Sequence, residues 1–461
     1  MSPTSPAQPD RTRTDGPPSA PAATVLTSDI ALVDGACRPG YAVRVQGGAI
    51  VASGARAEVV RPGDRVLDLG RRALLPGTVN AHNHSFQSLL RGFGDDLPFL
   101  EWRDRALYRY SPVILRPGAR GVYTGALFAF AEMALHGVTT VCDFFYLNDG
   151  GNDNARQVIQ AALDLGLRLV LGRCFYDWEG APVSYRERPA DARQRFLELH
   201  KEWAGHPLVA VQPAPHSLHG ASAEMITTAV GAAREVGVPY HIHLAEERYQ
   251  VDDALARYGV RPLDVLGVLG VLGADTIAVH GCWFDERERA RLGEVGGALA
   301  YNPGSNMFLG DGVTDIVDLD RHGVRIALGT DGGCSNSRVS VLDEMRSCAL
   351  LQKVHRLDGQ ALSAERAFHF GTRGGGEVLK LPIGHLGPGA RADLVFLDLD
   401  DPSLWPEQSL AKNVVYSLSS RAITDVFVEG EPVVRDRQLV RVEMAAIQAR
   451  VRELTASWTR D

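Results

Sequence analysis

Four short apolar runs end in residues that can bind a metal or carry a proton, and this repeated pattern limits the fold more than any other feature of the chain. The first run ends in the turn-forming pair Pro76-Gly77 and leads to His82 and His84, which are separated by one residue. Side chains alternate across a strand, so these two histidines are expected to point to the same side. Two imidazoles that converge at the end of a strand make half of a metal site.

The three later runs supply the other half of such a site. They lead to His243 and Glu246, to His280, and to Asp331. Any one of these residues alone is more often a helix cap or a hydrogen-bonded buried group. Four runs in the order His-x-His, His-x-x-Glu, His, Asp are hard to explain by core packing. In a parallel barrel the functional groups sit at the C-terminal ends of the strands, so the pattern predicts a (β/α)8 TIM barrel.

Size, charge and cysteine use narrow the class of protein. The 461 residues exceed the ~250 of a barrel, so a second, smaller domain is expected. A net charge of -8 argues against a nucleic-acid or anionic-membrane surface and favours a small-molecule substrate. The six cysteines form no Cys-x-x-Cys pair, which fits neither a thiolate zinc site nor a disulfide framework. No run approaches the ~18 apolar residues of a membrane span, and a cytoplasmic location is expected.

The chain divides into four predicted parts. Residues 1–24 are rich in Pro, Ser, Thr and Ala and are predicted to be a disordered tail that makes a poor signal peptide. Short strands with Gly-rich breaks fill 25–75, and strands in 385–440 resemble the other half of the same composite β-sandwich. Residues 76–384 are predicted to form the barrel, and 441–461 a final helix.

Within the barrel, apolar strand runs alternate with helical patterns, as expected for βα units. The predicted strands after the first run cover residues 137–143, 167–174 and 208–212, and the predicted helices cover 120–136, 156–165 and 223–236.

The ordered motifs resemble those of the amidohydrolase superfamily, the metal-dependent hydrolases and deaminases built on a distorted eight-stranded barrel. The resemblance covers nearly everything after the N-terminal tail and includes residues 387–395, similar to the family's return into a small β-sandwich. It is closest to the single-metal deaminase branch, because no lysine is placed to bridge two metals. The expected cofactor is one divalent ion, Zn²⁺ or alternatively Fe²⁺, with the ligands His82, His84, His243 and Asp331.

The resemblance also implies catalytic roles. Glu246, three residues after His243, would carry a proton from water to the departing nitrogen. His280 would polarise or steer the attacking water, and Asp331 would both bind the metal and accept a proton. The alternatives are that Glu246 forms a surface pair with Arg248 and that His280 is only a buried, hydrogen-bonded histidine.

Pocket motifs divide between two substrate classes. Residues 84–87, 99–103, 144–147, 214–218, 246–253 and 309–312 resemble N-formimino-L-glutamate deiminases. That resemblance implies substrate contacts from Gln87, Arg103, Tyr146 and His216, with the guanidinium holding a carboxylate. At position 219 those deiminases carry a second arginine, and this chain has His219. Arg103 can also be an ordinary solvated or ion-paired helix residue.

Other motifs point to heterocycle deaminases. Residues 89–92, 302–306 and 329–336 resemble methylthioadenosine/S-adenosylhomocysteine, aminopurine and triazine deaminases. The main hypothesis is an aminohydrolase that adds water to the C=N carbon of a formimino- or amidine-type compound and releases ammonia. The alternative is a deaminase of a purine nucleoside, pterin or triazine. A two-metal hydantoinase-type hydrolase and a non-enzymatic scaffold fit the motifs less well. A homodimer is expected, without nucleic-acid or membrane partners.

Overall fold

The computed structural model describes residues 23–458. The predicted disordered tail lies outside the described residues except for Ala23 and Thr24, and Thr24 already begins the first strand. Within this described part, no helix combines the length and the apolar character needed to cross a membrane.

Eight parallel strands form the centre of the molecule in two four-stranded sheets, and β9 neighbours β10 while β13 neighbours β6. Ladder hydrogen bonds are interrupted between the two sheets, which makes the barrel distorted. The strands are β6 (Thr78–Asn83), β7 (Val138–Phe145), β8 (Arg168–Phe175), β9 (Val209–Pro215), β10 (Tyr240–Leu244), β11 (Thr276–His280), β12 (Ala298–Tyr301) and β13 (Arg325–Leu328). The predicted barrel is confirmed.

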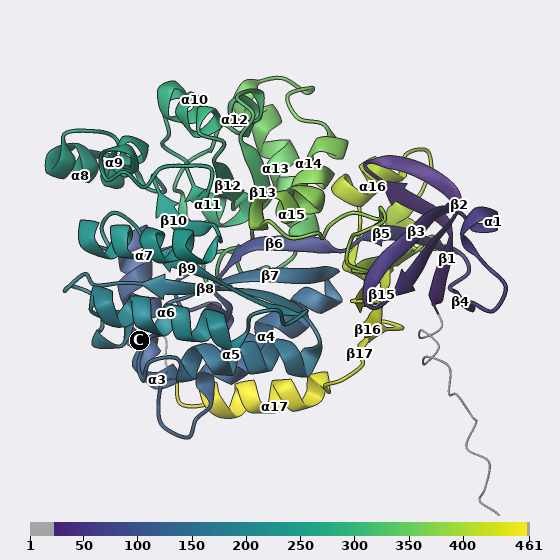
Figure 1. The fold of residues 1–461 in the computed structure, drawn as a ribbon, viewed down its shortest axis with the longest axis horizontal. Helices are drawn as coiled ribbons and strands as arrows, with labels where there is room; N and C mark the ends of the chain where they lie inside the picture. The colour runs from purple at the N-terminus through teal and green to yellow at the C-terminus, as the bar shows by residue number, and fades with distance from the viewer. Residues whose placement is uncertain (1–22, 459–461) are drawn as a thin grey trace, which may run out of the picture.

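Helices surround these strands (Figure 1) and bury them, as parallel sheets require. They are α4 (Gly121–Leu135), α5 (Asp153–Leu165), α6 (Pro189–Glu202), α7 (Ala223–Val236), α8 (Arg248–Tyr258), α9 (Pro262–Val268), α10 (Glu286–Glu294), α11 (Pro303–Leu309), α12 (Ile316–Arg321), α13 (Val341–Arg356), α14 (Ala364–Gly371) and α15 (Arg373–Leu379). Local capping residues set the ends of these helices, and α7 is an example. The Ser222 hydroxyl caps α7 by accepting from the Met225 backbone N–H at 3.1 Å, and Gly237 ends the helix with a φ of 74°.

Strands from both ends of the chain form one nine-stranded, mostly antiparallel sheet beside the barrel (Figure 1). The early strands are β1 (Thr24–Val33), β2 (Ala36–Gln46), β3 (Ala49–Ala55), β4 (Arg65–Asp68) and β5 (Arg72–Pro76), and the late ones are β14 (Leu394–Asp398), β15 (Ile423–Val428), β16 (Glu431–Arg435) and β17 (Gln438–Leu439). A bridge from Ala49 to Arg391 brings β3 back to the segment before β14, and an apolar core that includes Val43, Leu74 and Phe396 lies inside. This is the small sandwich expected from the two termini.

The other helices are not part of the βα alternation, and the first of them is α1 (Arg56–Val59), between β3 and β4. Residues 99–114 form α2 (Phe99–Trp102), a π-helical segment (Arg103–Tyr108) and α3 (Arg109–Ile114). In the C-terminal part, α16 (Leu410–Tyr416) precedes β15, and α17 (Met444–Thr455) packs along α4. The predicted last helix is thus found as α17, whereas the division of the chain into domains stays a prediction.

The first apolar run ends at Pro76-Gly77, as the sequence indicates, and a second strand follows it. Pro76 closes β5 in the terminal sheet, and β6 begins in the barrel at Thr78. Between them, a Cβ on Gly77 would lie 2.1 Å from the Thr139 hydroxyl, so only glycine fits this crossing. The Pro-Gly pair expected to end the apolar run is thus the point where the chain leaves the terminal sheet for the barrel, with Gly77 packed against Thr139 of β7.

Candidate metal centre and substrate pocket

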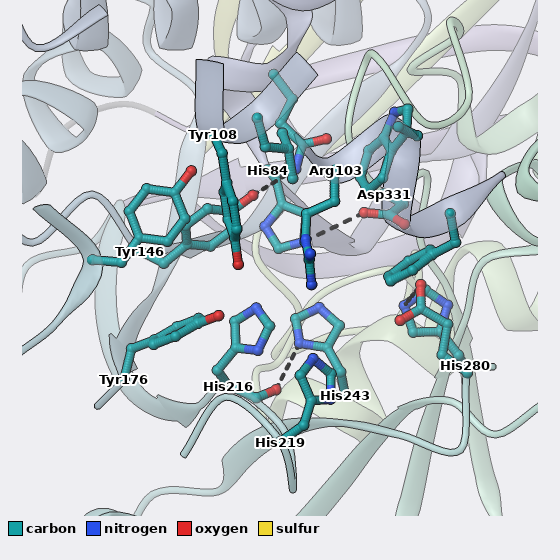
Figure 2. A pocket seen from close by; sticks show the side chains of 16 residues that line it. His84, Arg103, Tyr108, Tyr146, Tyr176, His216, His219, His243, His280 and Asp331 are labelled. Carbon is teal, nitrogen blue, oxygen red and sulfur yellow. Dashed lines mark hydrogen bonds and ion pairs between the residues drawn. The ribbon is translucent and has the colours of Figure 1, made fainter. Parts of the chain in front are cut away.

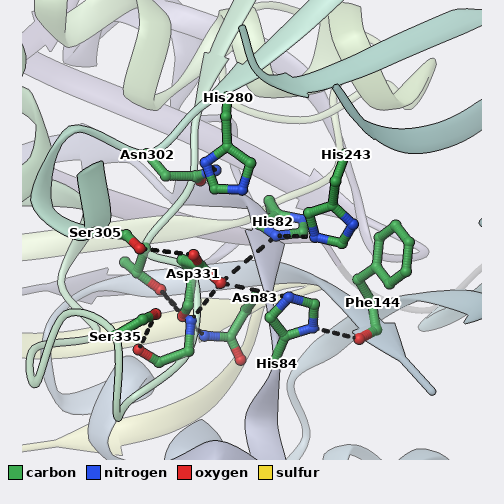
Figure 3. A network of polar contacts seen from close by, with 12 residues as sticks. His82, Asn83, His84, Phe144, His243, His280, Asn302, Ser305, Asp331 and Ser335 are labelled. Carbon is green, nitrogen blue, oxygen red and sulfur yellow. Dashed lines mark hydrogen bonds and ion pairs between the residues drawn. The ribbon is translucent and has the colours of Figure 1, made fainter. Parts of the chain in front are cut away.

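Three imidazoles and one carboxylate meet at the C-terminal ends of the barrel strands (Figure 3). His82 and His84 come from the end of β6, His243 from β10, and Asp331 from the segment after β13. The Asp331 Oδ1 atom is 3.6 Å from His82 Nε2 and 3.4 Å from His84 Nε2, and the Nε2 atoms of His82 and His243 are 3.3 Å apart. The structure thus brings together all four predicted metal ligands.

Backbone carbonyls determine which ring nitrogens of two histidines face the cluster. The Nδ1 of His84 is 2.6 Å from the Phe144 carbonyl oxygen, and the Nδ1 of His243 is 2.8 Å from that of His216. A carbonyl oxygen only accepts, so each Nδ1 carries the proton and each Nε2 presents a bare lone pair. Burial lowers the pKa of His84 and His243, which keeps both rings neutral.

The carboxylate is held in place as firmly as the rings. Oδ1 of Asp331 accepts from the Gly332 backbone N–H at 2.7 Å, and Oδ2 accepts from the Ser305 hydroxyl at 2.7 Å. Burial acts to raise the pKa of Asp331, but the adjacent His82 and His84 outweigh it and hold that pKa well below its usual range. Converging lone pairs and a fixed negative charge repel one another unless a cation lies between them. Nitrogen and oxygen donors in this number suit a divalent ion such as zinc.

Two predicted proton-handling residues stand beside the ligand cluster. Glu246 Oε1 is 3.4 Å from His280 Nε2, and both side chains are buried. Burial, together with the nearby Asp311 and Asp331 carboxylates, raises the pKa of Glu246 well above its usual range. The alternative of a surface pair between Glu246 and Arg248 is wrong, because Glu246 is 6% exposed.

Backbone strain accumulates at these strand ends. Ala245, His280 and Asp331 have φ values of 50°, 73° and 57°. These values lie in the left-handed region, which residues other than glycine adopt uncommonly. Such residues cost about 1–3 kcal/mol each and cluster at functional sites. His and Asp are enriched in this region compared with other residue types, so the strain at His280 and Asp331 is less unusual than the strain at Ala245.

The cluster borders a pocket that is partly open to solvent, and His84, His243 and Asp331 form part of its lining (Figure 2). All five predicted substrate-binding residues line it: Gln87, Arg103, Tyr146, His216 and His219. Six apolar or aromatic wall residues were missed as contacts by the sequence reasoning: Phe99, Trp102, Leu107, Tyr108, Tyr176 and Tyr185. Tyr176 directly follows β8, so its place at a strand end was a usable clue. Tyr185 lies in a short 3-10 helix and offered none.

Arg103 is both an ion-paired helix residue and a pocket residue, the two roles considered for it from the sequence. Its Nη2 is ion-paired with Asp104 at 2.8 Å, and its guanidinium lies over the rings of Tyr108 and Trp178 at 4.8 and 5.7 Å. The side chain nevertheless extends into the pocket (Figure 2). Burial and the charge of Arg103 lower the pKa of His219 to about 4, so the imidazole is neutral near pH 7.

An eight-stranded parallel barrel that gathers histidines and an aspartate at its strand ends defines the class of barrel metallohydrolases. The chain belongs to the amidohydrolase family, whose model matches residues 73–433. It is accordingly a hydrolase that acts on carbon–nitrogen bonds.

Individual relatives agree with this assignment. The chain is 35% identical over 391 residues to a 5-methylthioadenosine/S-adenosylhomocysteine deaminase of Syntrophobacter fumaroxidans, covering 84% of this chain and 86% of the relative. An adenosine deaminase from Xanthomonas campestris, solved with bound zinc, is 30% identical with a TM-score of 0.88, covering 95% and 99% of the two chains. An atrazine chlorohydrolase from Arthrobacter aurescens complexed with zinc has a TM-score of 0.87 at 22% identity, over 94% and 99%, and shows the shared fold.

Proposed function

We propose that this protein is a zinc-dependent aminohydrolase that deaminates an amino-substituted heterocycle of the adenosine type. The observation that carries the proposal is the placement of Glu246 and His280 beside the ligand cluster, on the floor of a pocket with aromatic walls. A flat ring system is the ligand that such walls fit best. The deaminases and the zinc-bound adenosine deaminase that the chain resembles support this choice over the formimino-type hypothesis.

The chemistry divides among the residues of this chain. Zinc held by His82, His84, His243 and Asp331 would supply water activation at neutral pH. Glu246 takes a proton from the attacking water and passes it to the leaving nitrogen, as a buried carboxyl with a raised pKa can do in both directions. A C–O bond forms at the ring carbon, the C–N bond breaks, and ammonia leaves.

The polar groups of the pocket support a substrate that is an uncharged ring with hydrogen-bond-accepting nitrogens. Gln87 Nε2 donates to the Tyr146 hydroxyl oxygen at 2.7 Å, so the Tyr146 proton is free for a ring nitrogen or carbonyl of the substrate. Among the described residues that line the cavity, Arg103 is the single guanidinium. The neighbouring Arg257 is engaged by Asp253 and by the Leu218 carbonyl. A diacid such as formiminoglutamate would therefore find one fixed cation rather than two.

A substrate panel tests the proposal. Ammonia release would be measured for adenosine, 5-methylthioadenosine, S-adenosylhomocysteine, a pterin, a triazine and N-formimino-L-glutamate, using zinc-loaded protein. We expect the highest kcat/KM on an adenosine-type compound. A higher kcat/KM on N-formimino-L-glutamate than on every heterocycle would overturn the proposal and restore the first hypothesis.

The homodimer and the cytoplasmic location belong to the same proposal. Light scattering coupled to size-exclusion chromatography measures the oligomeric state, and fractionation of the native cells measures the location.

A further inference from the structure

Distances alone leave two roles open for His280. Its ring nitrogen lies within 4.8 Å of ligand atoms of His82 and His243, and its ring stacks on that of His243 with centroids 5.5 Å apart. By proximity it could be another metal ligand or a hydrogen-bond donor to the reacting groups. The position of the ring proton decides between these roles, because a protonated nitrogen cannot bind a metal.

The surroundings of His280 differ from those of the ligand histidines. Its Nδ1 faces side-chain amide nitrogens, that of Asn306 at 3.0 Å and that of Asn302 at 3.4 Å (the latter labelled in Figure 3). An amide nitrogen only donates, so Nδ1 must accept and the proton must sit on Nε2. His84 and His243 face carbonyl oxygens and take the opposite tautomer.

A second contact orients the Asn306 amide. The same nitrogen donates to Oδ2 of Asp311 at 3.0 Å, and the Asp311 backbone N–H donates to the Asn306 backbone carbonyl at 3.0 Å, which keeps the two residues together. Asp311 is itself buried and fixed, since its carbonyl accepts from the indole N–H of Trp283 at 2.8 Å. The two amide hydrogens of Asn306 thus have two separate acceptors, one of which is His280.

We infer that Asn306 is a positioning residue that holds His280 in the tautomer with the proton on Nε2. In this form His280 offers the N–H on Nε2 to Glu246, whose Oε1 is 3.4 Å away, and to the oxygen that attacks the substrate, and it does not become a further metal ligand. The inference rests on the proposed function for its catalytic consequence, but the tautomer itself depends on the hydrogen bonds alone.

An exchange of two side chains tests the inference with the charge held constant. In the double variant Asn306→Asp, Asp311→Asn, the amide and carboxylate swap places, so their mutual hydrogen bond is kept while a carboxylate now faces His280. That carboxylate accepts from Nδ1, the proton leaves Nε2, and the donor is lost. We expect kcat to fall by about 10²-fold, the effect of removing one preorganised donor, with KM within about threefold and zinc content unchanged. The matched control Asp311→Asn keeps Asn306, and its amide oxygen can accept from Asn306 Nδ2 in place of the carboxylate, so it should lose no more than severalfold.

Nuclear magnetic resonance of zinc-loaded protein labelled with ¹⁵N-histidine reports the tautomer without any substrate. The His280 signals, assigned by their absence in His280→Asn, should show a protonated Nε2 in the wild type and a protonated Nδ1 in the exchange variant. The wild-type spectrum decides the tautomer even if the exchange variant does not fold, and it does so whichever compound the enzyme deaminates. A protonated Nδ1 in the wild type, or equal losses of kcat in the exchange variant and in Asp311→Asn, would overturn the inference.

Discussion

Replacing Glu246 with glutamine removes the proposed proton carrier and leaves the shape of the site unchanged. The amide keeps the shape of the carboxyl group, whose Oε1 lies 3.4 Å from His280 Nε2, but it cannot carry a proton. General acid–base groups commonly contribute ~10²- to 10⁴-fold, or about 2.7–5.4 kcal/mol of barrier at 1.36 kcal/mol per decade.

The structure places the expected loss in the upper part of that range. Among the described residues lining the cavity, the only other carboxylate is Asp331, which is fixed by Gly332 and Ser305. Glu246 is also 6% exposed, so bulk water has little access to take over the proton. We therefore expect kcat for Glu246→Gln to fall by about 10³-fold or more, with KM changed by less than about tenfold.

The assay is steady-state ammonia release on the best substrate of the panel, with zinc content and thermal unfolding measured on the same samples. Glu247→Gln makes the same chemical change one residue later, at a partly exposed side chain, and should stay within a fewfold of the wild type. A Glu246→Gln protein that retains its zinc and works within a fewfold of the wild type would refute the reasoning and assign the proton transfer to another group.

Three further predictions address the metal, the substrate and the fold. Elemental analysis should find one divalent metal per chain, and His82→Ala combined with His84→Ala should lose it; two tightly bound metals, or unchanged content in that variant, would contradict the ligand assignment. N-formimino-L-glutamate should be a poor substrate, and His219→Arg should raise its kcat/KM about ten- to a hundredfold by adding a bidentate contact worth ~1.5–3 kcal/mol; no gain would show that position 219 does not meet a carboxylate. Burial raises the pKa of Glu344 from 4.5 to about 8, so its ionisation destabilises the fold increasingly from pH 4.5 to 8 and not below. Denaturant unfolding should accordingly show Glu344→Gln gaining stability relative to the wild type by up to about 1.4 kcal/mol per pH unit in that window, and a difference independent of pH would contradict the raised pKa.

The parts predicted from sequence were those that depend on local periodicity. The helical patterns at 120–136, 156–165 and 223–236 are α4, α5 and α7, and the predicted strands at 137–143 and 167–174 are β7 and β8, each with its C-terminal end one or two residues further on. Alternation along a strand also placed His82 and His84 on one side, which the structure bears out.

The parts that could not be predicted depend on neighbours far away in the sequence. The tautomer of His280 follows from an amide contributed by Asn306, 26 residues later. The wall residue Tyr185 comes from an irregular segment whose hydroxyl meets that of Ser111, 74 residues away. No periodic pattern encodes such contacts, because they are set by how loops from different βα units meet above the barrel.

The terminal sheet also affects the order in which the molecule can be completed. Its early strand β5 pairs with β14, and the two are separated in the chain by the whole barrel. While the chain emerges from the ribosome, β1 can already pair with one edge of β5, but the other edge has no partner until Leu394 and the residues after it have been made. An unpaired apolar edge invites pairing with another chain. We therefore expect a chain truncated before β14 to aggregate even though all its metal-binding strands are present. The cause would be the unpaired edge of β5, in a sheet remote from the pocket.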